Sequence, residues 1–259
     1  MGIHRAMDRA ILEPLFADWP ENLVRSTLDG CMGEAYVNDT HTAAQVVNAD
    51  FSFLAGDTQC AEAQTLVAHV PEGFHADTFI IAAKEDAWYP LIEQQFGNRA
   101  ARSERYAIRK DVHHFNPEKL RGFAQTLPEG IELLQMDGER YRLAQRIEWA
   151  TDFVSQFADE ADFLARGLGV MALRNGELLA GASSYVVFKG GIEVEIDTRK
   201  DMRRQGLATA CGAMLVLLCL ERGLYPSWDA ANRDSVALAE KLGYVFDHPY
   251  PIYKVALKG

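Results

Sequence analysis

The C-terminal half of the chain has the clearest pattern of hydrophobic and polar positions. Short apolar runs bounded by turn residues predict strands, and apolar positions at helical spacing predict two helices between the first two strands. The strands are expected at residues 131–136, 170–174, 178–188 and 192–198, and the helices at 140–149 and 152–164. Asn175-Gly176 predicts a tight hairpin, because this pair readily supplies the two positive φ values of a type I′ turn.

Residues 206–222 predict a helix that is buried against a sheet. Its middle part, at 213–220, is apolar on every face, and Gly223 ends it. The remaining elements are expected to be a short strand at 227–230, a polar helix at 233–242 and closing strands at 244–257. This half therefore predicts an α/β fold, in which helices cover a sheet.

The N-terminal half is less regular. We expect an opening helix at 11–16, strands at 65–70 and 78–83, and a helix at 89–96 that ends near Gly97. X-Pro steps at Asn116-Pro117 and Leu127-Pro128 disfavour a continuous helix and mark a boundary. The predicted domains are an N-terminal α/β domain at 1–125, which could form a wall of the substrate site, and a second domain at 126–259.

Composition limits the classes of partner. With 259 residues the chain is long enough for two packing units. Its formal net charge of −11 repels phosphate backbones and anionic lipids, so we expect neither a nucleic-acid nor a membrane partner. An acidic surface favours cationic small molecules, although it also serves solubility alone.

The cysteines and histidines suggest no metal or disulfide chemistry. The four cysteines lack C-x-x-C spacing, and Cys211 and Cys219 lie in the apolar helix, where thiols are ordinary packing groups. His113-His114 lacks the spacing of a metal site, so no metal is expected. Because the sequence contains neither about 18 unbroken apolar residues nor a signal-peptide core, we expect a cytoplasmic protein.

The loop at 199–206 is the most informative stretch, because it joins a predicted strand to the buried helix. Unpaired amides at the start of a helix and the positive end of its dipole form an anion site. Gly206 and the small Ala208 allow a diphosphate to approach the backbone, and Arg203 and Arg204 add charge. The loop lacks the motifs of P-loop and dinucleotide folds. A capped helix with solvated arginines is the alternative interpretation.

Two motifs resemble the GNAT N-acetyltransferase superfamily. Arg203-x-x-Gly206-x-Ala208 after a strand is similar to the acyl-CoA diphosphate loop of that superfamily, and the segment from Asn232 to Tyr244 is similar to its N-x-x-[AS]-x-x-L-x-x-K-x-G-[FY] block. The resemblance covers about residues 130–257, and the long N-terminal half looks like a two-domain branch. It implies a mixed, mostly antiparallel sheet flanked by helices, with acetyl-CoA as co-substrate.

The resemblance also implies which residues bind coenzyme A. The backbone of 196–198 would pair with the pantetheine arm where this strand and the strand at 227–230 separate, and 203–209 would hold the diphosphate. Asn232 would hydrogen-bond the arm, with Ser235 nearby. The implied set is Ile196, Asp197, Thr198, Arg203, Arg204, Gln205, Gly206, Leu207, Ala208, Thr209, Asn232 and Ser235. Asn232 directly precedes a helix, so it is equally a candidate N-cap.

Acyl transfer to an amine needs a general base and an N–H donor near the thioester. Alternation along the strand at 192–198 places Glu193, Glu195 and Asp197 on one face, about 6–7 Å apart. Glu195 is the first candidate for the base, acting through water, and Glu193 is the second. A backbone N–H of this strand would polarise the carbonyl. The alternative interpretation is a solvated strand face.

One position departs from many members of the superfamily. Ala239 stands four residues before Gly243, where a tyrosine often protonates the leaving thiolate. Either Tyr244 or another tyrosine replaces it, or the thiolate leaves without an acid, or the protein binds acyl-CoA without turnover.

The N-terminal half contains a weak echo of the second motif. Leu91 to Gly97, followed by Tyr106, is similar in pattern to Leu238 to Gly243, followed by Tyr253. This suggests a degenerate GNAT-like half that lacks the diphosphate loop and so does not bind coenzyme A.

The expected function is direct transfer of an acetyl group from acetyl-CoA to a primary amine in a cleft between the two halves, without a covalent acyl-enzyme. The acidic balance favours a small cationic amine as the substrate. The alternatives are a non-catalytic acyl-CoA sensor or interaction module and a protein N-acetyltransferase. Monomer and dimer both remain open.

Overall fold

The computed structural model describes residues 2–257, which form two compact units. One unit comprises the chain up to Arg105 together with the chain from Tyr250 onward, and the other comprises Tyr106–Pro249. The chain passes from one unit to the other within β6 (Ala100–Ile108) and again within β13 (Phe246–Ala256). The predicted boundary at 125/126 falls in the second unit, directly after α5 (Pro117–Gln125).

The second unit contains a five-stranded sheet in the order β11-β10-β9-β8-β7. Its strands are β7 (Glu132–Gln135), β8 (Gly169–Arg174), β9 (Glu177–Phe188), β10 (Gly191–Thr198) and β11 (Tyr225–Ser227). All neighbours are antiparallel except β10 and β11, which are parallel. The predicted hairpin between β8 and β9 is confirmed, since Asn175 and Gly176 have φ values of 51° and 81°.

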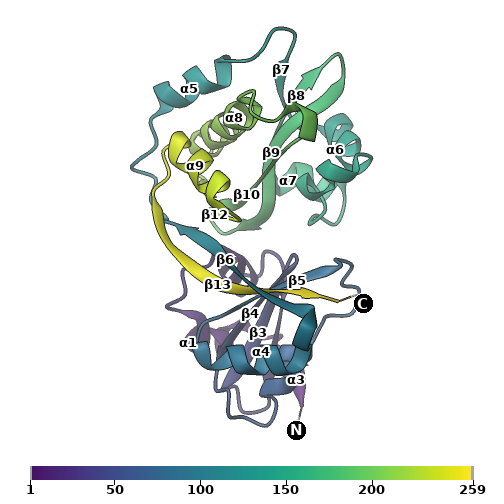
Figure 1. Ribbon diagram of the computed structural model, residues 1–259, viewed down its shortest axis with the longest axis vertical. Coiled ribbons are helices and arrows are strands. Elements are labelled where there is room, and N and C mark those ends of the chain that lie inside the picture. Colours follow the sequence, from purple (N-terminus) through teal and green to yellow (C-terminus); the bar gives the residue numbers. More distant parts are fainter. Residues whose placement is uncertain (1, 258–259) are drawn as a thin grey trace. The chain divides into compact units, whose positions relative to one another are not determined.

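Helices cover both faces of this sheet (Figure 1). On one side lie α8 (Leu207–Glu221), α9 (Arg233–Leu242) and α5, and on the other lie α6 (Gly138–Gln145), the 3-10 segment η4 (Glu148–Phe153) and α7 (Glu160–Arg166). The helix predicted at 152–164 is wrong at its start. The side chain of Asp159 accepts a hydrogen bond from the amide of Asp162 and caps the helix there, so α7 begins at Glu160.

The predicted buried helix is confirmed as α8. Its side chains are buried on every side between the sheet, α5 and α9, and both Cys211 and Cys219 are among them. Burial of the whole circumference explains why the sequence shows no polar face there. Gly223 follows the helix with a φ of +67°, as expected of a helix stop.

The strand predicted at 227–230 is two strands in different sheets. β11 pairs with β10 only from Tyr225 to Ser227, whereas β12 (Asp229–Ala230) pairs with the end of β6. The chain therefore turns away from β10 after Ser227. Trp228, between the two strands, is buried among α8, α9 and Tyr244 and fixes this turn by packing.

The first unit is built on strands in the order β1-β2-β3-β4-β5-β13-β6. The strands not yet given are β1 (Ile3–Arg5), β2 (Glu34–Asn38), β3 (Ala43–Asn48), β4 (Phe51–Gly56) and β5 (Thr78–Ala83). From β1 to β4 the neighbours are antiparallel, and β4 and β5 are parallel. This succession matches β7 to β11 of the second unit, so the predicted likeness between the two halves is confirmed for strand order.

The helices of the first unit are short. They are η1 (Arg9–Leu12), α1 (Glu13–Phe16), α2 (Asn22–Leu28), α3 (Ala63–Ala68), η2 (Asp86–Trp88), α4 (Tyr89–Phe96) and η3 (Gly97–Arg99). The predicted strand at 65–70 is wrong, because this segment lies in and just after α3. A connection between parallel strands must cross over the sheet, and the buried positions Ala63, Leu66 and Val67 have helical spacing.

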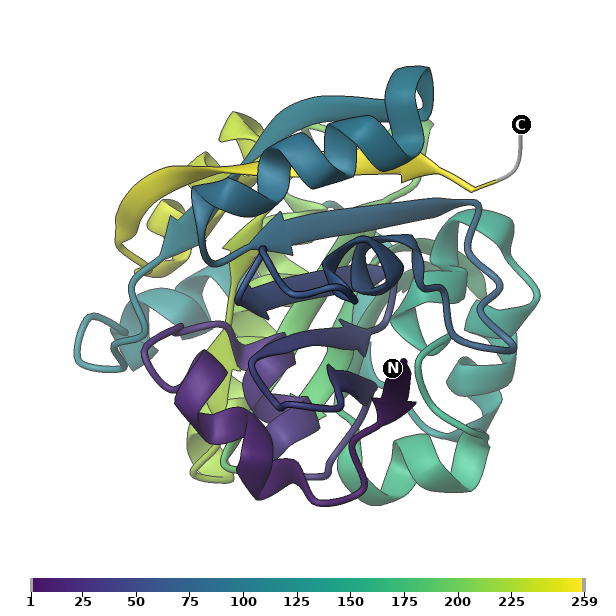
Figure 2. The same cartoon turned by 90° about the horizontal axis from the view of Figure 1, so that it is seen from below.

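The end of the chain completes the sheet of the first unit. Figure 2 shows β13, in yellow, alongside β5, and the two strands pair from Tyr253–Ile81 to Ala256–Thr78. Ile252, Tyr253 and Val255 of β13 are fully buried, and the last two belong to the core formed by α3, α4 and the sheet. The stability of the first unit therefore depends on residues about 170 positions away in the sequence.

We predict that Ile252→Ala lowers the free energy of unfolding by about 2–5 kcal/mol, because it leaves a cavity at a fully buried position. Lys254→Ala, at an exposed position of the same strand, is the control and should change it by less than about 0.5 kcal/mol. Urea unfolding followed by far-UV circular dichroism measures both. Equal stability of the two variants would show that β13 is not integral to the sheet.

Candidate functional site

A groove of about 490 Å³ lies in the second unit, between the end of β10 and the first turns of α8 and α9. Its lining includes eleven of the twelve residues expected to bind coenzyme A, and Gln205 is the exception. The complete lining is Ile196, Asp197, Thr198, Met202, Arg203, Arg204, Gly206, Leu207, Ala208, Thr209, Asn232, Asp234, Ser235, Ala237 and Leu238. The structure thus brings together two motifs that are about 25 residues apart in sequence.

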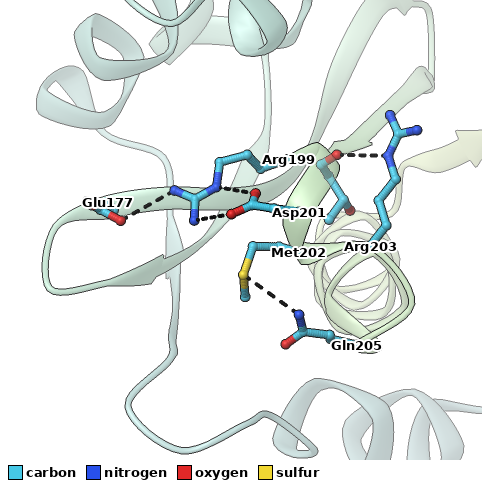
Figure 3. Close-up of polar contacts among 7 residues, drawn as sticks. Glu177, Arg199, Asp201, Met202, Arg203 and Gln205 are labelled. Carbon is cyan, nitrogen blue, oxygen red and sulfur yellow. Dashed lines mark hydrogen bonds and ion pairs between the residues drawn. The ribbon is translucent and has the colours of Figure 1, made fainter.

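The loop between β10 and α8 is braced by its own side chains (Figure 3). The Arg199 guanidinium donates to both carboxylate oxygens of Asp201 and to Glu177 of β9, at 2.7, 3.1 and 3.3 Å. Met202, in the 3-10 turn η5 (Lys200–Met202), is buried, and the side-chain amide of Gln205 lies 3.8 Å from its sulfur. Gln205 therefore supports the loop from outside the groove.

Two residues with positive φ set the direction in which α8 starts. Arg204 has a φ of 64° and Gly206 a φ of 83°. A Cβ on Gly206 would meet no atom within 4 Å, so glycine is needed there for its backbone conformation and not for space. The following residues, Leu207, Ala208 and Thr209, line the groove, and amides of a first helical turn have no partner within the helix. The groove therefore has the features of an anion site.

The two arginines of the motif differ in how firmly they are held. Arg203 donates from Nε to the carbonyl of Thr198 at 3.2 Å, and its Nη2 lies 3.4 Å from Asp197 Oδ1. Arg204 makes a loose pair with Asp234 at 3.8 Å, with both side chains 90% exposed. An exposed pair of this kind contributes little to stability, so Arg204 can move to an anion at small cost.

Thr198 is a residue of the groove lining and carries a buried polar atom. The residue is 8% exposed, and among the described residues its hydroxyl has no hydrogen-bond partner. A buried hydroxyl without a partner costs about 1–3 kcal/mol. A ligand or water in the groove would remove that cost, so this atom indicates a binding position.

Asn232 is confirmed as the N-cap of α9. Its Oδ1 accepts a hydrogen bond from the amide of Ser235 at 2.9 Å, which leaves the side-chain NH2 group for another acceptor. The hydroxyl of Ser235 accepts a hydrogen bond from Trp228 Nε1 at 3.1 Å, so its own proton also remains to be donated. Both groups line the groove and can donate to one ligand.

The edge of β10 beside the groove is open. β11 pairs with β10 only at 191–193, and the rest of β10 has β9 as its neighbour on the other edge. The Arg199 amide donates to Leu179 of β9, and amides alternate between the edges of a strand. It follows that the amides of Val194 and Ile196 point to the open edge, where an extended ligand can pair with them.

The carboxylates of β10 lie on the opposite face from Val194 and Ile196, which contact the core under α8 and α9. Glu193 is only 5% exposed, Glu195 and Asp197 are half-buried, and β9 carries one extra residue, Tyr185, opposite the Glu193–Val194 step. The predicted alternation is therefore present. The interpretation as a solvated strand face fails for Glu193, because that side chain is buried.

Among the residues that the structure describes, no tyrosine belongs to the groove lining. Ala239 is fully buried and belongs to the core cluster that also contains Trp228 and Tyr244. Tyr244 is also buried, its hydroxyl donates to the Pro226 carbonyl at 2.8 Å, and burial raises its pKa well above the ordinary value. Tyr244 is thus held as a structural residue, and its candidacy as the acid loses support.

Sequence reasoning missed four lining residues, namely Met202, Asp234, Ala237 and Leu238. The last three share one face of α9 with Ser235, and their helical spacing was the signal that could have identified them. Asp234 brings a negative charge to the rim, where it pairs loosely with Arg204 and weakens the anion site.

No group of three or more His, Cys, Asp or Glu side chains in residues 2–257 is arranged to hold a metal ion. Within the same residues, none of the helices combines the length and the apolar character that a membrane crossing needs.

Comparison with known proteins gives one consistent result. A family model described as GNAT acetyltransferase matches residues 13–253. The Bacillus subtilis protein named uncharacterized N-acetyltransferase YdfB is 24% identical over 210 residues, which are 78% of this chain and 76% of that protein.

Solved structures agree. A GCN5-related N-acetyltransferase-like protein from Streptococcus suis is 38% identical with a TM-score of 0.87, over 96% of this chain and 99% of that one. A tandem GNAT protein from the clavulanic acid biosynthesis pathway is 13% identical with a TM-score of 0.58, over 99% of this chain and 98% of that one. The second likeness shows the fold alone, and its tandem organisation fits the two units described above.

We predict that Asn232→Ala lowers the free energy of unfolding by about 1 kcal/mol, because the start of α9 loses its cap. Asn232→Ser keeps a capping oxygen, so its free energy of unfolding should differ from that of wild type by no more than about 0.3 kcal/mol. Chemical denaturation of both variants measures the difference. If Asn232→Ala unfolds like wild type, the cap contributes nothing and the residue serves only a ligand.

Proposed function

Because the chain belongs to the GNAT acetyltransferase family, we propose that it transfers an acetyl group from acetyl-CoA to a primary amine by direct attack. The observation that carries this proposal is the groove, which joins an anion site at the start of α8 to the open edge of β10. A molecule with a diphosphate at one end and an extended amide-containing arm at the other fits both parts.

In this proposal the diphosphate lies on the amides of Leu207, Ala208 and Thr209. Arg203 supplies a fixed positive charge, and Arg204 can leave its loose pair with Asp234 to add a second. The Thr198 hydroxyl gains the hydrogen-bond partner that it lacks among the described residues. The positive φ of Gly206 is what points these amides at the ligand.

The pantetheine arm then runs along β10 as an added strand. The amides of Val194 and Ile196 donate to it from one side, and the NH2 group of Asn232 and the hydroxyl of Ser235 approach it from α9. Asn232 thus serves as both helix cap and ligand donor, since the two roles use different atoms. Asp197 contributes to the site by holding Arg203 in place.

The thioester at the end of the arm comes to the part of β10 that carries the carboxylates. We assign Glu195 as the general base, acting through water, with Glu193 as the second candidate, and the Val194 amide as the donor that polarises the carbonyl. Burial raises the pKa of the Cys211 and Cys219 thiols to about 12, so neither supplies a thiolate nucleophile. This supports direct attack by the amine.

The acceptor that fits best is a small cationic amine. Glu193 and Glu195 place two carboxylates along one face of β10, next to Asp197, which pairs with Arg203, and the chain carries a net charge of −11. Both features attract an ammonium group before it loses its proton. A panel of polyamines, amino acids and peptides, with acetyl-CoA and detection of the released thiol, separates this acceptor from a protein N-terminus.

We predict opposite effects of Thr198→Val on stability and on binding. Removal of a buried hydroxyl without a partner should leave the free energy of unfolding unchanged or higher, whereas the affinity for coenzyme A should fall about ten-fold, the value of one hydrogen bond. Calorimetric titration with coenzyme A and urea unfolding measure the two quantities. Thr126→Val, at the exposed residue directly after α5 and outside the groove, is the control for the binding measurement. Unchanged affinity would remove the Thr198 hydroxyl from the site.

We predict that Glu195→Gln reduces turnover by about 10²-fold or more while coenzyme A still binds, because a general base contributes at least that factor. Glu132→Gln, at an exposed position of β7 outside the groove, is the matched control and should retain full activity. Wild-type turnover in Glu195→Gln would transfer the role to Glu193. Binding of coenzyme A by wild type without thiol release from any amine would support a non-catalytic acyl-CoA sensor instead.

A further inference from the structure

Ser227 lies at the point where β10 and β11 separate. It is the last residue of β11, it is fully buried, and it is opposite Glu193 in the last pair that the two strands form. Beyond this pair the edge of β10 is open. An arm that follows this edge from Thr198 toward Val194 ends where the edge closes, which is at Ser227.

The side chain of Ser227 is bonded to a lysine. Lys110, in the loop after β6, donates from Nζ to Ser227 Oγ at 3.0 Å and lies 3.4 Å from the carbonyl oxygen of Trp228. An ammonium group only donates, so Ser227 Oγ accepts this bond and its own O–H proton remains for a further acceptor. Lys110 is itself exposed, and solvent can exchange protons with it.

Ser227 and the buried carboxylate share one face of the sheet. Residues opposite each other in neighbouring parallel strands point to the same side, so Ser227 lies beside Glu193. Tyr225, two residues earlier in β11, is on this side as well. Burial, and then the charge of Glu193, raise the pKa of Tyr225, which places its ring near that carboxylate.

The hydroxyls of the two nearby tyrosines donate hydrogen bonds to backbone carbonyls. The Tyr225 hydroxyl donates to the Arg109 carbonyl at 3.1 Å, and the Tyr244 hydroxyl donates to the Pro226 carbonyl at 2.8 Å. Ala239 has no proton to give. Ser227 therefore differs from these tyrosines, because its recorded hydrogen bond leaves its proton available.

We propose that Ser227 is a catalytic residue that gives its proton to the leaving sulfur, and that Lys110 supplies Ser227 with a replacement. This inference rests on the proposed function. The amine nitrogen bonds to the carbonyl carbon, and its proton passes through water to Glu195. The carbon–sulfur bond breaks, the sulfur keeps the electron pair, and it takes the Ser227 proton. Lys110 reprotonates Ser227 and regains a proton from solvent.

A lysine is chemically suited to this task. An ammonium group carries three protons and can transfer one to a hydrogen-bonded acceptor, whereas a serine hydroxyl has a single proton to give. A serine alone is a far weaker acid than a thiol, which is why the pair is needed. The two hydrogen bonds of Lys110 hold its ammonium at the serine.

The test compares four variants with wild type at saturating acetyl-CoA and amine. We expect Ser227→Ala and Lys110→Gln each to lower kcat by about 10²-fold, the lower end for general acid catalysis, with the Kd for coenzyme A and the KM for the amine unchanged. Lys110→Arg distinguishes a proton donor from a purely structural residue. A guanidinium keeps the charge and both hydrogen bonds but does not release its proton, so this variant should lose as much kcat as Lys110→Gln.

Arg109→Gln is the matched control, since Arg109 is a neighbouring exposed cation that pairs with Asp247 at 3.7 Å, and it should keep wild-type kcat. Urea unfolding verifies that each variant is folded. Wild-type kcat in Ser227→Ala would overturn the proposal, because the reaction would then proceed without the proposed proton donor. Wild-type kcat in Lys110→Arg would also overturn it, because Lys110 would then have only a structural role. Wild type that binds no coenzyme A or releases no thiol would overturn the proposed function, and this inference with it.

Discussion

The site depends on the short parallel contact between β10 and β11. Three residue pairs hold the strands together, and packing of Trp228 between α8 and α9 then directs the chain into another sheet. The separation leaves amides of β10 without a strand partner on one edge. It also leaves room for the first turns of α8 and α9 to face that edge. A longer contact would extend the sheet and close the groove.

The first unit shows what happens when this constraint is absent. It has the same strand order, with β4 and β5 as its parallel pair, but the corresponding edge is filled. The Lys84 amide donates to Leu54, and the Gly56 amide donates to the Glu85 carboxylate at 3.0 Å. The connecting helix α3 has six residues, against fifteen in α8. Strand order alone therefore does not make a binding site.

Backbone groups form most of the candidate site, and side chains adjust it. In the proposed complex the amides of α8 and β10 bind coenzyme A whatever side chains their residues carry, provided that Gly206 keeps its positive φ. Catalysis instead needs particular side chains, and in this chain the position where many superfamily members have a tyrosine is occupied by Ala239. Ala239 packs in the core, while Ser227 and Lys110 form a hydrogen-bonded pair at the end of β11. Under our proposal the binding motif persists, while the source of the proton moves from α9 to the end of β11.

The sequence by itself determined the elements with strong local signals. Asn175-Gly176 predicted a hairpin, the apolar run around Ala213 predicted a buried helix, and Arg203 to Ala208 predicted a loop that lines the groove, because turn chemistry, periodicity and helix ends are local properties. The sequence did not predict β3, because all six of its residues are buried and the strand has no alternation of buried and exposed positions.

Only the tertiary structure decided the rest, since the contacts involved are distant in sequence. It divided residues 227–230 between two sheets, completed the first unit with β13, and placed Lys110 against Ser227 across 117 positions. No local pattern encodes such pairings, because packing of separate segments creates them.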